Sequence, residues 1–75
     1  MHLPASTGEV AQFLGVTEPR LNDLIRRGRI DPLPTVASGR RRWSAEHVIA
    51  AAIASGIDAQ ATRLRLMAAA ARVSP

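Results

Sequence analysis

Apolar residues recur at helical spacing near the start of the chain. Val10 and Leu14 are one helical turn apart, and they follow Ser6 and Glu9, which have the spacing of a capping box. Gly15 is the residue type that most often ends a helix. The pattern predicts a first helix that begins after Ser6 and stops at Gly15.

A second amphipathic run follows almost at once. Thr17 is a suitable N-cap, and Pro19 falls in the first turn, where its missing amide costs nothing. The apolar stripe of this run is formed by Leu21, Leu24 and Ile25, and it extends to Gly28. Because only two residues separate the first helix from the second cap, residues 6–28 are predicted to form a helix-turn-helix.

Residues 31–34 contain two prolines and cannot continue a helix. Residues 35–37 and 40–43 read as two short strands, and Ser38-Gly39 between them supplies a tight turn. The segment from about residue 33 to 43 is therefore predicted to be a hairpin, or wing.

The rest of the chain predicts two more helices, at about residues 44–55 and 58–72. Ser44 caps the first of them, whose expected buried side consists of Val48, Ile49, Ala52 and Ile53. Asp58 caps the second, whose expected apolar stripe consists of Ile57, Ala61, Leu64, Ala68 and Ala71. Residues 1–75 are thus expected to form a single, mostly α domain with a small β-hairpin.

The composition narrows the range of possible functions. Ten arginines and no lysine oppose six acidic residues, which gives a net charge of +4 and indicates a polyanionic partner. With 75 residues, no cysteine and two distant histidines, we expect no metal site, no cofactor and no enzyme activity. The longest apolar stretch, residues 48–54, is too short to cross a bilayer, so we expect no membrane contact and a reducing cytoplasm.

The outward side of the second helix carries the candidates for base contact. On a helical projection Asn22, Asp23 and Arg26 point away from the apolar stripe. Asn22 suits adenine, Arg26 or Arg20 suits guanine, and Asp23 suits cytosine; alternatively, Asp23 forms an intrahelical ion pair with Arg27. The candidates for DNA contact on this helix are Thr17, Pro19, Arg20, Asn22, Asp23, Arg26 and Arg27.

Three consecutive arginines on the hairpin are the second group of candidates. Because side chains alternate along a strand, Arg40 and Arg42 should face one way, and Arg41 and Trp43 the other. We expect Arg40 and Arg42 to contact phosphates or a minor groove, although a solvated loop is the alternative. Arg41 is either a DNA contact or a structural cap, and Trp43 is expected to pack under the wing.

The last helix has more apolar residues than one stripe needs. Leu66, Met67 and Val73 lie off the expected stripe. Either the core wraps further around this helix, or these residues form an oligomer contact. His47, on the third helix, is expected either at the surface or next to the helix cap.

In combination and order, several motifs within residues 6–57 resemble the winged helix-turn-helix of the MerR-like superfamily. These motifs are Thr7-Gly8-Glu9-Val10-Ala11, Leu14-Gly15-Val16-Thr17, Leu21, Gly28-Arg29-Ile30 and Gly39-Arg40-Arg41-Arg42-Trp43-Ser44-Ala45-Glu46-His47-Val48. The resemblance implies that the helix within residues 17–27 enters the major groove and that the wing touches the adjacent minor groove or its phosphates. It also implies that Arg41 is the wing arginine of the family pattern and that Trp43 replaces its usual aromatic residue.

The chain departs from full-length MerR regulators, which carry a long dimerisation helix and an effector domain. It ends at Pro75 and has no cysteine, so effector sensing is not expected. Its shortness and arginine content resemble excisionases, the recombination directionality factors of phages and integrative elements. These bind repeated sites and bend DNA so that an integrase is directed toward excision.

The resemblance therefore implies double-stranded DNA as the partner, an integrase as a further partner, and head-to-tail self-association on DNA. It implies a bacterial or phage-encoded, nucleoid-associated protein. A small MerR-like transcription regulator is the alternative, and a protein-interaction module that uses the last helix is the second alternative.

Overall fold

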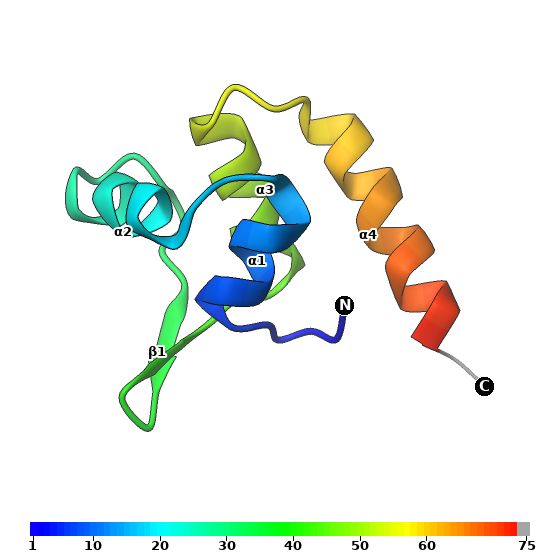
Figure 1. The fold of residues 1–75 in the computed structure, drawn as a ribbon, viewed down its shortest axis with the longest axis horizontal. Coiled ribbons are helices and arrows are strands. Elements are labelled where there is room, and N and C mark those ends of the chain that lie inside the picture. Colours follow the sequence, from blue (N-terminus) through cyan, green and yellow to red (C-terminus); the bar gives the residue numbers. More distant parts are fainter. Residues whose placement is uncertain (74–75) are drawn as a thin grey trace.

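The computed structural model describes the backbone of residues 1–73 and the side chains of residues 1–69. It contains four helices and one two-stranded antiparallel hairpin. In chain order the elements are α1 Thr7–Leu14, α2 Glu18–Arg26, β1 Thr35–Ala37, β2 Arg40–Arg42, α3 Ala45–Ala54 and α4 Ala59–Val73. Helix α2 and the hairpin lie on one side of α1, and α4 lies on the other (Figure 1). None of the described helices is long and apolar enough to span a membrane.

The caps of the first two helices agree with the sequence prediction. The Ser6 hydroxyl accepts from the Glu9 amide at 3.2 Å, and the Glu9 carboxylate accepts from the Ser6 amide at 3.0 Å, which lowers the pKa of Glu9. Gly15 ends α1 in a left-handed conformation with φ 74°. The Thr17 hydroxyl then accepts from the Arg20 amide at 3.2 Å and starts α2. The short link between the helices is therefore fixed at both ends by local hydrogen bonds.

The hairpin also forms as predicted. Ala37 pairs with Arg40 across the two-residue turn Ser38-Gly39, in which both residues have positive φ, 53° and 76°. Two positive φ values are typical of a turn whose twist matches that of the flanking strands.

Trp43 joins the base of the hairpin to the helices. Its side chain is fully buried, and its backbone exchanges hydrogen bonds of 2.8 and 2.9 Å with Ala5. The indole Nε1–H donates to the Thr7 hydroxyl at 3.0 Å. The prediction that Trp43 packs under the hairpin is confirmed. The core around it comprises Ala5, Val10, Ala11, Leu14, Leu21, Leu24, Ile30, Val48, Ala50, Ala51, Ala52 and Leu66.

The buried side of α3 differs from the prediction. Val48 and Ala52 are buried as expected, but Ile53 is 61% exposed. Of the two expectations for His47, the structure shows the cap position: His47 is buried, and its Nδ1 accepts from the Ser44 amide at 3.0 Å. The buried arc is centred on Ala51 because short alanine side chains let neighbouring elements approach closely.

Helix α4 is likewise rotated relative to the prediction. Thr62 and Leu66 are buried, whereas Leu64, expected in the core, is 59% exposed. Of the two alternatives for Leu66, the structure shows a core that extends further around the helix: Leu66 is 6% exposed, and it lines a groove together with Met67. Met67 is 63% exposed, and the Val73 side chain lies outside the described side chains.

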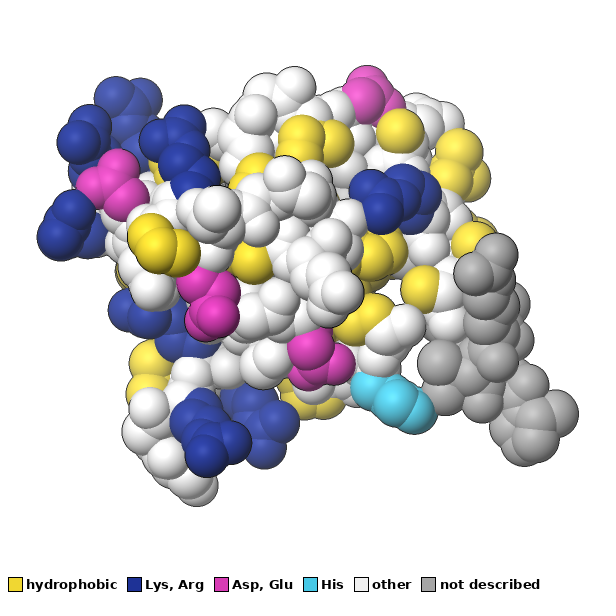
Figure 2. Space-filling model, in the orientation of Figure 1, with side chains coloured by type: hydrophobic (Ala, Val, Ile, Leu, Met, Phe, Trp, Pro, Cys, Tyr) yellow, Lys and Arg dark blue, Asp and Glu magenta, His cyan; other side chains and the backbone are white. Residues whose placement is uncertain are grey.

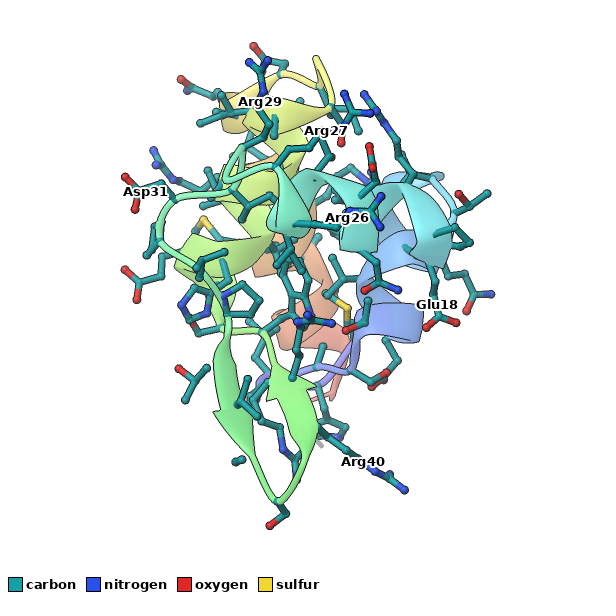
Figure 3. All side chains as sticks on the ribbon, turned by 90° about the vertical axis from the view of Figure 1, so that its left-hand side faces the viewer. Glu18, Arg26, Arg27, Arg29, Asp31 and Arg40 are labelled. Atoms are coloured by element: carbon teal, nitrogen blue, oxygen red, sulfur yellow. The ribbon has the colours of Figure 1, made fainter. Side chains whose placement is uncertain are left out.

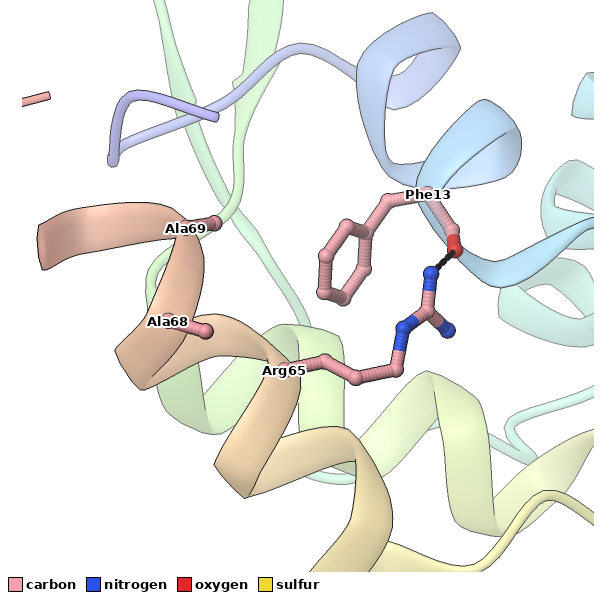
Figure 4. Close-up of a pocket in the computed structure, with 4 residues that line it drawn as sticks. All are labelled: Phe13, Arg65, Ala68 and Ala69. Atoms are coloured by element: carbon pink, nitrogen blue, oxygen red, sulfur yellow. Dashed lines mark hydrogen bonds between the residues drawn. The ribbon is translucent and has the colours of Figure 1, made fainter. Parts of the chain in front are cut away.

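A contact between α4 and α1 accompanies this orientation of α4. The Arg65 guanidinium lies 4.3 Å from the centre of the Phe13 ring and donates to the Phe13 carbonyl at 2.7 Å (Figure 4). With Arg65 directed at α1, Leu66 faces the core. The buried Thr62 hydroxyl is satisfied because it donates to the Asp58 carbonyl at 2.8 Å.

The corrected orientation of α4 predicts unequal costs for two similar substitutions. Leu66→Ala should lower the free energy of unfolding by about 2–5 kcal/mol, because it leaves a cavity in the core. Leu64→Ala, on the exposed side of the same helix, should change it by less than about 0.5 kcal/mol. Urea denaturation of both variants measures the difference, and equal losses would contradict the orientation described.

Candidate nucleic-acid interface

Most of the positive charge lies on one side of the molecule. Residues 20–42 contain seven arginines against two aspartates, a formal charge of +5, so the rest of the chain has a net charge of −1. We call this side the basic face; its arginines are Arg20, Arg26, Arg27, Arg29, Arg40, Arg41 and Arg42. In Figure 2 arginine side chains gather along the left edge in an upper and a lower group. Figure 3 views that edge directly, with Arg26 between Arg27 and Arg29 above and Arg40 on the hairpin below.

Helix α2 directs its polar side outward as predicted. Leu21 and Leu24 are buried and Ile25 is half-buried. The exposed positions are Thr17, Glu18, Pro19, Arg20, Asn22, Arg26 and Arg27. The orientation of the predicted ridge is therefore confirmed, while its contact with DNA stays a prediction.

Asp23 is half-buried and forms ion pairs with two arginines. Its Oδ1 lies 2.7 Å from Arg26 Nη2, and its Oδ2 lies 3.0 Å from Arg27 Nε. The hydrogen bond from Arg26 is the main cause that lowers the pKa of Asp23, and the charge of Arg27 adds to it. Of the two roles considered for Asp23, the structure shows the ion pair. In a contact with cytosine, Asp23 would have to accept with an oxygen that already accepts from an arginine.

One hydrogen bond connects α2 with the hairpin. Arg41 Nη1 donates to Asn22 Oδ1 at 3.1 Å, although the two residues are 19 positions apart. Arg41 is half-buried, whereas Arg40 and Arg42 are exposed, so the predicted alternation along β2 is confirmed. Arg41 has the bridging position of a structural residue, and its neighbours extend from the same strand into solvent. The bond holds the arginine-bearing hairpin next to α2.

The basic face contains a hollow that the sequence did not indicate. Arg20, Arg27 and Arg29 surround it, above Leu24 and Ala54 at the ends of α2 and α3. The Arg29 amide donates to the Leu24 carbonyl at 2.9 Å, which fixes the backbone there. Arg29 follows the end of α2, so helical periodicity gave no signal for it. Three guanidiniums around one hollow suit an anion such as a phosphate.

The described residues do not form a metal site. Among them no group of three or more His, Cys, Asp or Glu side chains is placed to hold a metal ion. Comparison with protein-family models, curated proteins and solved structures gave no match. The basic face is therefore interpreted from its own geometry.

The pairing of Asp23 predicts a specific acid titration. Its pKa should lie below the ordinary value of about 3.9, so its ion pairs are intact at neutral pH and are lost as pH falls through the lowered value. An NMR titration of the carboxyl carbon measures this. In the Arg26→Ala/Arg27→Ala variant the pKa should return toward 3.9, and an unchanged pKa would show that the arginines do not cause the shift.

Proposed function

We propose that this chain is a DNA-binding domain of the MerR-like winged helix-turn-helix type. In this proposal α2 enters the major groove and the hairpin lies against the adjacent minor groove or its phosphates. The observation that carries the proposal is the hydrogen bond between Asn22 and Arg41, because it holds the arginine-bearing hairpin beside the outward side of α2.

The charge distribution supports a duplex as the ligand. Arginines lie on both sides of α2, on the hairpin on one side and around the hollow on the other (Figure 3). A helix that enters a groove passes between two phosphate backbones, so cations on both sides of it can be neutralised together. Arg40 and Arg42 would bind one backbone, and Arg20 and Arg29 the other.

We further propose an architectural role of the excisionase type, in which the domain binds repeated sites and bends DNA for an integrase. The resemblance of the sequence motifs and the small size of the domain support this role. A single domain of this kind buries only about 600–1,000 Å² on DNA, so neighbouring copies would raise occupancy. Footprinting and circular-permutation bending assays on DNA from the encoding element test the role: an isolated, unbent promoter site would instead favour the transcription regulator.

An exposed apolar surface supports the second candidate, a protein-interaction module. Leu64 and Met67 on α4 are 59% and 63% exposed, and Met67 lines an apolar groove with Leu3 and Ile49. The same surface would serve self-association on DNA, with Met67 as its contact in place of Leu66. The two candidates separate on salt dependence: a module that binds only protein has no duplex affinity that falls with salt.

The hairpin arginines should contribute to the salt dependence of binding. Replacing Arg40 and Arg42 by alanine should weaken binding to any duplex and reduce the slope of log K against log salt by about two units, since two phosphate contacts are lost. Fluorescence anisotropy at several salt concentrations measures the slope. Arg63→Ala, an exposed arginine on α4 outside the basic face, is the control and should leave the slope unchanged.

The hollow gives a separate prediction. Arg29→Ala should reduce the slope by about one unit and weaken random and preferred duplexes equally, because a phosphate contact carries no sequence information. The same titration measures it. A loss confined to one sequence would mean that Arg29 contacts a base, and no loss would mean that the hollow lies outside the interface.

A further inference from the structure

We propose that the outward side of α2 reads guanine, because the polar atoms that its internal hydrogen bonds leave unbonded are donors. This inference rests on the proposed DNA-binding function and specifies which base edge the domain accepts. For Arg26 it agrees with what side-chain identity predicts, but for Asn22 and Asp23 it differs, because side-chain identity alone predicts adenine and cytosine.

The first step is the orientation of the Asn22 amide. An arginine side chain has five donors and no acceptor, so the Asn22 atom that faces Arg41 must be the oxygen. The donor-only chemistry of Arg41 therefore fixes which end of the Asn22 amide is the oxygen. The Asn22 amide therefore has its NH₂ group available for a ligand, while its oxygen is already bonded to Arg41.

The second step is the state of Asp23. Both of its carboxylate oxygens accept from arginines, one from Arg26 and one from Arg27. Each guanidinium keeps further N–H groups for a ligand, because only one nitrogen of each is used. Asp23 therefore orients two donors and offers no unbonded oxygen of its own.

The remaining carboxylate of α2 lies elsewhere. Glu18 is at the first residue of the helix, and its Oε2 would lie 3.3 Å from a Cβ placed on Gly8 of α1. Figure 3 shows Glu18 at the α1 end of α2, away from Arg26 and Arg40. From Pro19 to Arg27, then, the unbonded polar atoms of the described outward side chains of α2 are donors.

The unbonded donors of α2 favour one base over the others. In the major groove guanine presents two adjacent acceptors, N7 and O6, whereas adenine pairs its N7 acceptor with an N6 donor and cytosine presents an N4 donor. An asparagine pairs with adenine through both its oxygen and its nitrogen, so Asn22 would have to accept from adenine N6 with an oxygen that already accepts from Arg41. Asn22 and Arg26 thus match guanine, and the donors of adenine or cytosine would face other donors.

The test begins with selection of bound sequences from a duplex library with a randomised centre, using the full chain. We expect guanine at one or more enriched positions. Replacing such a guanine by 7-deazaguanine, which lacks the N7 acceptor, should weaken binding about 5- to 100-fold. The effect should disappear in Asn22→Ala or Arg26→Ala if that residue makes the contact.

Two variants test the role of the bond to Arg41. Asn22→Asp keeps an acceptor toward Arg41 but turns the outward group into an acceptor, so the guanine preference at its base pair should be lost. Arg41→Met frees the Asn22 oxygen, so the ratio of guanine to adenine affinity should fall about tenfold or more. The ratio cancels any general loss of affinity, and thermal unfolding shows whether each variant is folded.

The outcomes separate this inference from the function on which it rests. Enrichment of adenine or cytosine at the positions read by Asn22 or Arg26, or an unchanged preference in Asn22→Asp, would overturn the guanine assignment and leave DNA binding intact. Absence of salt-dependent binding to any duplex would overturn the proposed function itself.

Discussion

The packing of the Trp43 indole in the core is the interaction on which the rest of the structure depends. The hairpin has strands of only three residues, and Val36 on it is 65% exposed, so it lacks a core of its own. Trp43 attaches the hairpin to the core of the domain. Its indole packs among the helices and donates to Thr7, and its backbone pairs with Ala5. The position of the basic face is therefore set by the hydrophobic core, and the bond between Arg41 and Asn22 refines it.

The basic face places like charges close together, which costs stability in the free protein. Asp23 offsets part of this cost, because one carboxylate shared by Arg26 and Arg27 neutralises charge within α2. No equivalent acid pairs with Arg40 or Arg42 among the described residues. The uncompensated charge thus lies on the hairpin, where a phosphate backbone would relieve it.

The sequence predicted the features that depend on neighbours along the chain. Ser6 with Glu9, Thr17 and the Ser38-Gly39 turn act through local hydrogen bonds and backbone preferences, and all formed as expected. The predicted orientations of α3 and α4 were wrong because the faces of an alanine-rich helix differ little in hydrophobicity. A contact between Arg65 and Phe13, 52 positions apart, accompanies the orientation of α4, and periodicity carries no trace of it.

The same distinction applies to the candidate site. Helical periodicity identified which residues of α2 face outward, but it treated each side chain as free to use its whole set of donors and acceptors. Asn22 and Asp23 are not free, because Arg41 and the neighbouring arginines use their oxygens. A side chain recognises a ligand with the donors and acceptors that its hydrogen bonds within the protein leave unused. Since one of those bonds comes from the hairpin, the conformation of the hairpin would be coupled to the base preference that we propose for α2.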